Sequence, residues 1–276
     1  MNPHQQDGLD LAAYLDRIGH GGPVAADLAT LRALQLAHIT AVPFENLDAV
    51  RGVVPSLELA DLQDKIVRRR RGGYCFEHNR LFAAALRAAG LAVRPVAARV
   101  VLGAERHGDR PRTHMTLLVG VPGEPLPFLA DAGFGAAGAP LAPLPLTEGA
   151  EQTAGGRRHR LLRTAPVTDG LDTGDERAWV MQFHGADGWA DQYVFTTEPA
   201  MPVDQTVANW FVAAHPRSPF KERVFVQRTG EGVHRSLSGR EYTVTREDGS
   251  VERRILADDE EVRKVVAIEM GLPGDA

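Results

Sequence analysis

A single cysteine, Cys75, occurs among the 276 residues of the chain. One thiol cannot form an internal disulfide, and it cannot supply a CxxC metal pair, so no metal site is expected. An unpaired cysteine fits a reducing compartment, and residues 1–10 have neither the basic start nor the apolar segment of a signal peptide. We therefore expect a cytoplasmic protein.

Long apolar runs and an excess of positive charge are also missing. No apolar run approaches the roughly 20 residues of a membrane span, so no membrane association is expected. The chain has 31 lysines and arginines against 36 aspartates and glutamates, a net charge of −5, which argues against a nucleic-acid partner. With 43% hydrophobic residues, the sequence is typical of a soluble globular protein with a sizeable core.

Helical periodicity characterises the first 90 residues, where apolar side chains recur at positions i, i+3, i+4 and i+7. Between the second and third predicted helices, Glu45 lies in an apolar stretch, and Arg71 is its candidate ion-pair partner. The predicted helices cover residues 9–18, 27–38, 58–69 and 75–90.

Strand-like segments follow from residue 91 to about residue 202 and predict an antiparallel sheet or small barrel. For the remainder, 203–276, the pattern predicts a helix, short strands and a closing helix. The sequence therefore predicts an α+β fold in three parts, 1–90, 91–202 and 203–276.

The surroundings of Cys75 favour reactivity over simple packing. Gly72, Gly73 and Tyr74 precede it, and the helix that follows places the thiol on its first turn. Unpaired N–H groups and the positive end of the helix dipole favour a thiolate there. The alternative is that Cys75 is an ordinary buried residue, as most lone cysteines are.

His114 is the candidate base for this sulfur because it lies on a predicted strand rather than in a loop. If the next turn pairs Val121 with Leu126, then Thr116 lies opposite Asp131, and Asp131 is a diagonal neighbour of His114 at roughly 7–8 Å. A carboxylate beside an imidazole is the orienting pair of a catalytic triad. The alternatives are a hydrogen-bonded core histidine and an aspartate that serves only a turn.

The glycines at 133, 135 and 138 match a G-x-G-x-x-G pattern. Pro140 follows instead of a helix, and no βαβ unit surrounds the segment, so we do not interpret it as a dinucleotide site. The bend could still let phosphates or an aromatic ring approach the backbone closely.

Four motifs in the sequence are distinctive in combination. They are Arg71-Gly72-Gly73-Tyr74-Cys75-Phe76-Glu77-His78-Asn79, Pro43-Phe44-Glu45-Asn46-Leu47, Thr113-His114-Met115 and Asp131-Ala132-Gly133-Phe134-Gly135. Together they resemble the arylamine N-acetyltransferase family of the prokaryotic type. The resemblance implies a helical bundle, a central β-barrel and a C-terminal α/β lid, with a papain-like Cys-His-Asp core. It places the nucleophile on Cys75, the base on His114 and the orienting carboxylate on Asp131. Ala132 and Phe128 depart slightly from the family pattern.

The resemblance also implies acetyl-coenzyme A as cosubstrate, no permanently bound cofactor, and an arylamine or arylhydrazine acceptor, as in xenobiotic metabolism. A monomer or small homo-oligomer is expected. Two other enzyme functions stay open, an amide synthase in a biosynthetic pathway and a Cys-His-Asp hydrolase, as does a non-catalytic acyl-coenzyme A binder. The candidate substrate-binding residues are Phe134, near the acceptor ring, and Gly133, Gly135, Tyr74, Phe44 and Phe211.

Overall fold

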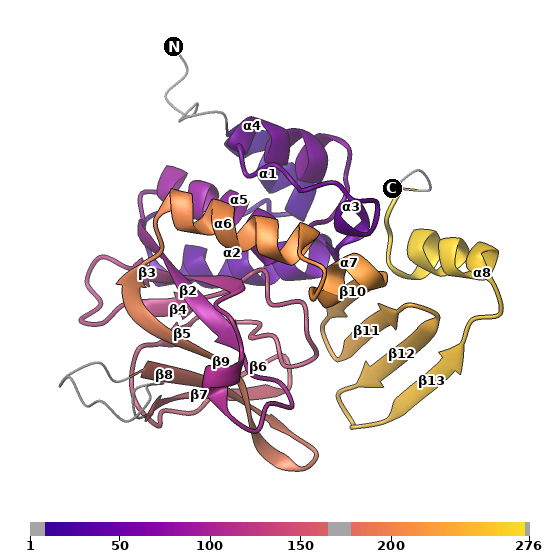
Figure 1. The fold of residues 1–276 in the computed structure, drawn as a ribbon. Coiled ribbons are helices and arrows are strands. Elements are labelled where there is room, and N and C mark those ends of the chain that lie inside the picture. The colour runs from indigo at the N-terminus through magenta and orange to yellow at the C-terminus, as the bar shows by residue number, and fades with distance from the viewer. Residues whose placement is uncertain (1–8, 165–177, 274–276) are drawn as a thin grey trace.

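The computed structural model describes residues 9–164 and 178–273. The N-terminal helices lie against one end of a β-barrel, and a second, smaller sheet lies beside the barrel (Figure 1). The described part of the chain therefore has the predicted mixture of helices and antiparallel strands.

The predicted N-terminal helices are present, and aspartate side chains cap the first two. Asp10 accepts a hydrogen bond from Ala13 N at 3.0 Å, and Asp27 accepts one from Thr30 N at 2.8 Å. The helix predicted over 58–69 is present as well, but only its first turn is α-helical and the rest is a π-helix. The helices are α1 (Leu11–Ile18), α2 (Leu28–Ala41), α3 (Leu47–Val50), α4 (Leu59–Leu62), the π-helix Gln63–Arg68 and α5 (Cys75–Ala88).

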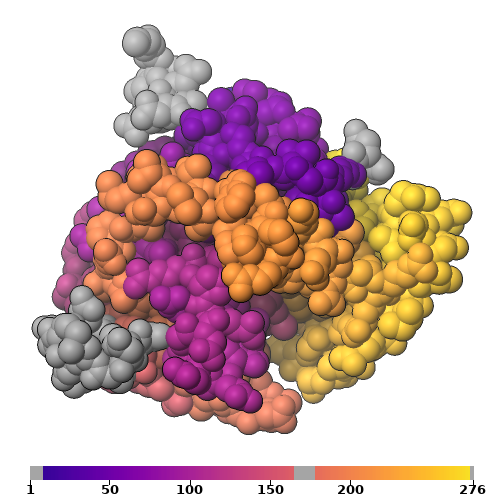
Figure 2. Space-filling view, viewed as in Figure 1, coloured from indigo at the N-terminus to yellow at the C-terminus, as the bar shows by residue number. Residues whose placement is uncertain are grey.

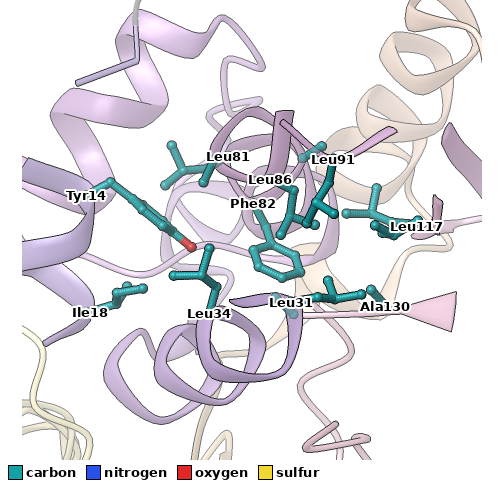
Figure 3. Close-up of a cluster of buried hydrophobic side chains, with 14 of the residues drawn as sticks. Tyr14, Ile18, Leu31, Leu34, Leu81, Phe82, Leu86, Leu91, Leu117 and Ala130 are labelled. Carbon is teal, nitrogen blue, oxygen red and sulfur yellow. The ribbon is translucent and has the colours of Figure 1, made fainter. Parts of the chain in front are cut away.

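The core of this region joins the helices to the barrel. Helices α1, α2 and α5 meet around a cluster of fully buried side chains that also takes in Leu117 and Ala130 from barrel strands (Figure 3). Burial of each large aliphatic or aromatic side chain is worth about 1.5–3 kcal/mol. The helix that begins at Cys75 therefore packs against the barrel as well as against α1 and α2. Other members of the cluster are Tyr14, Ile18, Leu31, Leu34, Leu81, Phe82, Leu86 and Leu91.

Eight strands form an antiparallel sheet in the order β5-β4-β3-β2-β9-β8-β7-β6. A bridge between Glu148, just after β5, and Leu161 on β7 brings the two ends together, so the barrel is nearly closed. Pro95 lies within β2, and the pairing of β2 with β9 shifts register between Val96 and Ala98. The strands are β2 (Ala92–Val100), β3 (His114–Gly120), β4 (Phe128–Ala130), β5 (Leu144–Pro145), β6 (Gln152–Ala154), β7 (Arg157–Thr164), β8 (Ala178–Gly185) and β9 (Gly188–Pro199).

The register predicted for the β3–β4 hairpin is confirmed. Leu117 pairs with Ala130, so their positions sum to 247, as do those of Thr116 and Asp131 in the prediction. The predicted pairing of Val121 with Leu126 is wrong, because the ladder already ends where Val119 pairs with Phe128. Prolines on both sides of Leu126 have no N–H to donate to a partner strand.

The second sheet, formed mostly by the C-terminal region, includes one strand that sequence periodicity did not predict. Strand β1, from within the predicted helical bundle, pairs with β10 and forms one edge of the second sheet. The division into 1–90, 91–202 and 203–276 therefore stays a prediction. The elements are α6 (Pro202–Ala214), α7 (Pro219–Glu222), β1 (Phe44–Glu45), β10 (Phe225–Gly230), β11 (Val233–Ser238), β12 (Glu241–Arg246), β13 (Val251–Ile255), α8 (Asp259–Lys264) and a final π-helical turn, Val265–Glu269.

Within residues 9–164 and 178–273, no helix is both long enough and apolar enough to cross a lipid bilayer.

Two buried histidines link α2, α5 and the segment before β1. His78 Nε2 lies 3.2 Å from the carbonyl oxygen of Pro43, which only accepts, so this nitrogen donates. His38 Nε2 must then donate to His78 Nδ1 at 2.8 Å, and the Tyr14 hydroxyl donates to His38 Nδ1 at 2.8 Å. The chain of hydrogen bonds is complete only while both rings are neutral.

We expect the fold to lose stability as the pH falls from 6.5 to about 4. Burial lowers the pKa of His78 and His159 to about 4 and of His234 to about 3, and it lowers that of His38 well below its usual value. The unfolded chain therefore binds more protons in this window, and stability present above pH 6.5 is lost below it. Burial raises the pKa of Glu77 to about 7, so in this window the folded protein holds a proton on Glu77 that the unfolded chain releases. This one group therefore reduces the loss of stability.

Urea unfolding should thus show a free energy of unfolding that is roughly 2–5 kcal/mol lower at pH 5 than at pH 7. H159Q removes one of the titrating groups and should flatten this dependence. Equal unfolding midpoints at pH 7 and pH 5 would contradict the neutral, hydrogen-bonded state of the buried rings.

Candidate active site

Cys75 is the first residue of α5, as predicted, and the two glycines before it are required by close contacts. A Cβ atom on Gly72 would lie 2.0 Å from the carbonyl oxygen of Pro43, and one on Gly73 would lie 2.8 Å from Glu77 Oε2. Glu77 in turn accepts a hydrogen bond from Tyr74 N at 3.0 Å. The glycines let the chain pass beneath the start of the helix, and the cap fixes the turn that carries the sulfur.

His114 and Asp131 form a buried pair at the barrel end that faces α5. Nε2 of His114 lies 2.7 Å from Oδ2 of Asp131, and the two side chains are 3% and 0% exposed. Burial alone would lower the pKa of His114, but the carboxylate outweighs it and raises that pKa to about 10. The pKa of Asp131 is lowered despite its burial, because of the charge and hydrogen bond of His114.

The sulfur of Cys75 meets the other side of this imidazole. Because Nε2 is held by Asp131, Nδ1 is left to face the thiol, and a hydrogen bond with Cys75 contributes to the raised pKa of His114. The sulfur also lies 3.6 Å from the carbonyl oxygen of Thr113. The three side chains selected from the sequence are therefore neighbours in space.

Asn79 completes the arrangement, and the sequence analysis assigned it no role. Its amide nitrogen donates to Asp131 Oδ1 at 2.9 Å and to the carbonyl oxygen of Met115 at 2.6 Å, and its oxygen accepts from Ala132 N at 3.0 Å. Asn79 lies four residues after Cys75 and thus on the same face of α5. This spacing and the place of Asn79 at the end of the motif that begins at Arg71 were the signals in the sequence that could have identified it.

The glycine-rich bend after Asp131 packs against the start of α5. A Cβ on Gly133 would lie 2.8 Å from Cys75 Cα, and one on Gly135, whose φ is +61°, would lie 2.6 Å from the ring of Phe44. The aromatic ring that approaches this backbone therefore belongs to the protein itself. Phe134, between the glycines, lies edge-on to His114 with ring centroids 5.4 Å apart.

A cleft of about 390 Å³ opens beside His114, between the barrel and α6. Phe211 on α6 and Phe76 on α5 line it, together with the smaller apolar residues Val207 and Ala208. In Figure 2, α6 forms an orange band between the indigo helices and the magenta barrel segments. The cleft offers an apolar path to one edge of the imidazole.

The other predicted substrate-binding residues have structural partners. Tyr74 is fully buried, and its hydroxyl donates to the side-chain oxygen of Asn209 on α6. Phe44 is 9% exposed and stacks on His78 with an angle of 10° between the rings. Both rings support the walls around Cys75 rather than lining the cleft beside His114.

The predicted pairing of Glu45 with Arg71 is present, with Glu45 Oε1 2.8 Å from the guanidinium. It belongs to a larger buried cluster of charges below the start of α5 that also includes Lys65.

A thiol beside an imidazole that is paired with a carboxylate can be activated as a nucleophile by these side chains themselves. The imidazole can hold the thiol proton, and the carboxylate fixes the tautomer and stabilises the imidazolium. Such an arrangement is suited to acyl transfer through a thioester on the sulfur.

Comparison with known proteins identifies close relatives. A family model described as N-acetyltransferase matches residues 27–274. The arylamine N-acetyltransferase of Mycobacterium tuberculosis is 38% identical over 249 residues, which span 90% of this chain and 84% of that protein.

Solved structures show the same fold. The crystal structure of Nocardia farcinica arylamine N-acetyltransferase is 42% identical, with a TM-score of 0.88 over 99% of this chain and 93% of that one. The Mycobacterium marinum arylamine N-acetyltransferase in complex with CoA is 37% identical, with a TM-score of 0.85 over 95% of this chain and 93% of that one.

Proposed function

Because the chain belongs to the arylamine N-acetyltransferase family of acyltransferases, we propose that it acetylates the nitrogen of aromatic amines and hydrazines in two half-reactions through an acetyl-cysteine on Cys75. The observation that carries this proposal is the buried 2.7 Å contact of His114 with Asp131 beside the only cysteine of the sequence. These three residues act as nucleophile, base and orienting carboxylate.

In the first half-reaction, the thiolate of Cys75 attacks the carbonyl carbon of acetyl-coenzyme A. The bond from that carbon to the coenzyme sulfur breaks, and His114 gives its proton to the departing thiolate. One thioester replaces another, so the step is nearly isoenergetic. Acetyl-coenzyme A as the donor accords with the CoA in the Mycobacterium marinum complex.

In the second half-reaction, the amine nitrogen attacks the acetyl-cysteine, His114 takes a proton from that nitrogen, and the bond to Sγ breaks. The products are an amide and the original thiolate–imidazolium pair. Aromatic amines are unprotonated near neutral pH, so they attack readily, whereas water must first lose a proton. This difference favours transfer over hydrolysis.

Helix α5 and the apolar cleft supply the remaining contacts in this proposal. The N–H of Cys75 is one of the first amides of α5, which have no partner within the helix, and it donates to the oxyanion. Phe134, which borders His114, packs against the acceptor ring, and Phe211 lines its approach. The protein acts in the cytoplasm, as a monomer or small homo-oligomer without a resident cofactor.

Release of coenzyme A thiol, measured with and without a panel of aromatic amines and hydrazines, tests this function. Donor alone should release one thiol per enzyme and leave one acetyl group on the protein by intact mass, and amine should make the release continuous. Continuous release without amine would indicate a hydrolase, and no reaction with acetyl-coenzyme A would favour the amide synthase.

A further inference from the structure

We propose that Lys65 is a positioning residue for this reaction: its buried ammonium holds the carboxylate that caps the Cys75 helix and so fixes the sulfur against His114. The inference rests on the proposed function for its effect on turnover, but its effect on thiol geometry can be measured separately.

Lys65 is 6% exposed and makes charged contacts on several sides. Its Nζ lies 2.6 Å from Glu77 Oε1, 2.7 Å from Asp48 Oδ2 and 3.8 Å from Glu45 Oε1. A lysine this deeply buried is rare unless it is paired. Its position is therefore determined by these carboxylates rather than by solvent.

Arg71 is the other cation of the cluster. It lies 2.8 Å from Glu45 and 2.7 Å from Asp48, and within the described part of the chain it forms no ion pair with Glu77. Three carboxylates thus share two cations, and the ion pair of Glu77 within the cluster is with Lys65. Loss of Lys65 would leave Arg71 as the one cation beside Glu45, Asp48 and Glu77, and breaking such a pair leaves an uncompensated charge.

Glu77 connects this cluster to the reacting sulfur. One of its oxygens binds Lys65, and the other accepts the hydrogen bond from Tyr74 N, the residue directly before Cys75. Burial raises the pKa of Glu77 to about 7, and the charge of Lys65 acts against that rise. The ammonium therefore favours the ionised form of the cap, and its contact with Oε1 holds that carboxylate in place.

An irregular backbone delivers Lys65 to this position. The lysine lies within the π-helix Gln63–Arg68, and π-helical turns in other proteins often mark functional sites. Arg70, two residues after the end of this π-helix, has φ +53°. It is the only non-glycine residue with positive φ within 9–164 and 178–273. Unfavourable backbone of this kind persists where surrounding contacts require it.

The test compares K65M with K65M/E77Q. We expect K65M to lower kcat/KM for acetyl-coenzyme A by about 10²-fold, mainly through kcat, because a small misplacement of a reacting group has this effect. Alkylation of Cys75 by iodoacetamide should slow in parallel. In K65M/E77Q the neutral amide can still accept from Tyr74 N, so both rates should return to within about fivefold of the wild-type values.

R69M is the matched control, since Arg69 is on the same segment but forms an exposed ion pair with Asp64. It should change neither rate. Wild-type rates in K65M would overturn the proposal, as would a folded double variant that reacts no faster than K65M. If K65M alone does not fold, the double variant decides, and an unfolded or slowly alkylated double variant overturns the proposal. Absence of any acetyl transfer by the wild type would instead refute the proposed function and leave the alkylation test valid.

Discussion

The C75A variant should fold normally and show no detectable acetyl transfer. Acyl transfer through an acetyl-cysteine needs a nucleophilic sulfur, and no other cysteine in the sequence can replace it. Removal of the nucleophile from a comparable triad lowers kcat by about 10⁶-fold. The truncated side chain is small, so we expect a change in unfolding free energy of about 1 kcal/mol or less.

The measurement is coenzyme A release with amine present, together with intact mass after incubation with donor alone. Wild-type protein should gain one acetyl group and C75A none. Circular dichroism and thermal unfolding establish that the fold is retained. Turnover by folded C75A at more than about a thousandth of the wild-type rate, or an acetyl group on another residue, would remove Cys75 from its assigned role.

The hairpin between His114 and Asp131 shows how far sequence reasoning reaches. Pairing along a strand has a period of two, so a correct register places every side chain on its proper face. The predicted register of this hairpin was correct. The predicted end of the ladder was wrong, because Leu126 lies outside it. The contact of His114 with Asp131 could therefore be predicted without knowledge of the rest of the fold.

Contacts between distant segments could not be predicted in this way. Strand β1 has only two residues, too few to show any period, and its partner β10 lies about 180 positions further along the chain. Asn79 has an ordinary helical position, and its partners Met115, Asp131 and Ala132 all come from distant segments of the chain. Such features depend on long-range packing, which local sequence patterns do not indicate.

The charged cluster that contains Lys65 and Glu77 could be predicted only in part. The sequence offered Arg71 as a candidate ion-pair partner for Glu45, which lies in an apolar stretch, and the structure contains that pair. It did not indicate Lys65, whose place on a predicted helix gave no reason to expect burial. The π-helical turn that redirects this side chain has no marker in the residue pattern.

A D131N variant should keep its fold and lose acetyl transfer by about 10⁴-fold, the loss expected when a triad histidine is held in the wrong tautomer. The geometry around residue 131 determines how the new amide must orient. Oδ1 accepts hydrogen bonds from Asn79 Nδ2 and from Gly133 N, both at 2.9 Å. The oxygen of the introduced amide must keep these two donors, and its nitrogen is then directed at His114.

With an amide N–H facing it, Nε2 of His114 has to accept instead of donate, and the ring proton moves to Nδ1 on the side of Cys75. A neutral ring in that tautomer cannot take the thiol proton, so Cys75 alkylation near neutral pH should slow along with acetyl transfer. D191N is a matched control, because Asp191 Oδ2 lies 2.8 Å from His107 Nε2 in a half-exposed pair away from Cys75, and it should change neither rate. Near-normal kcat in D131N would show that the carboxylate does not orient His114, whatever the distance between them.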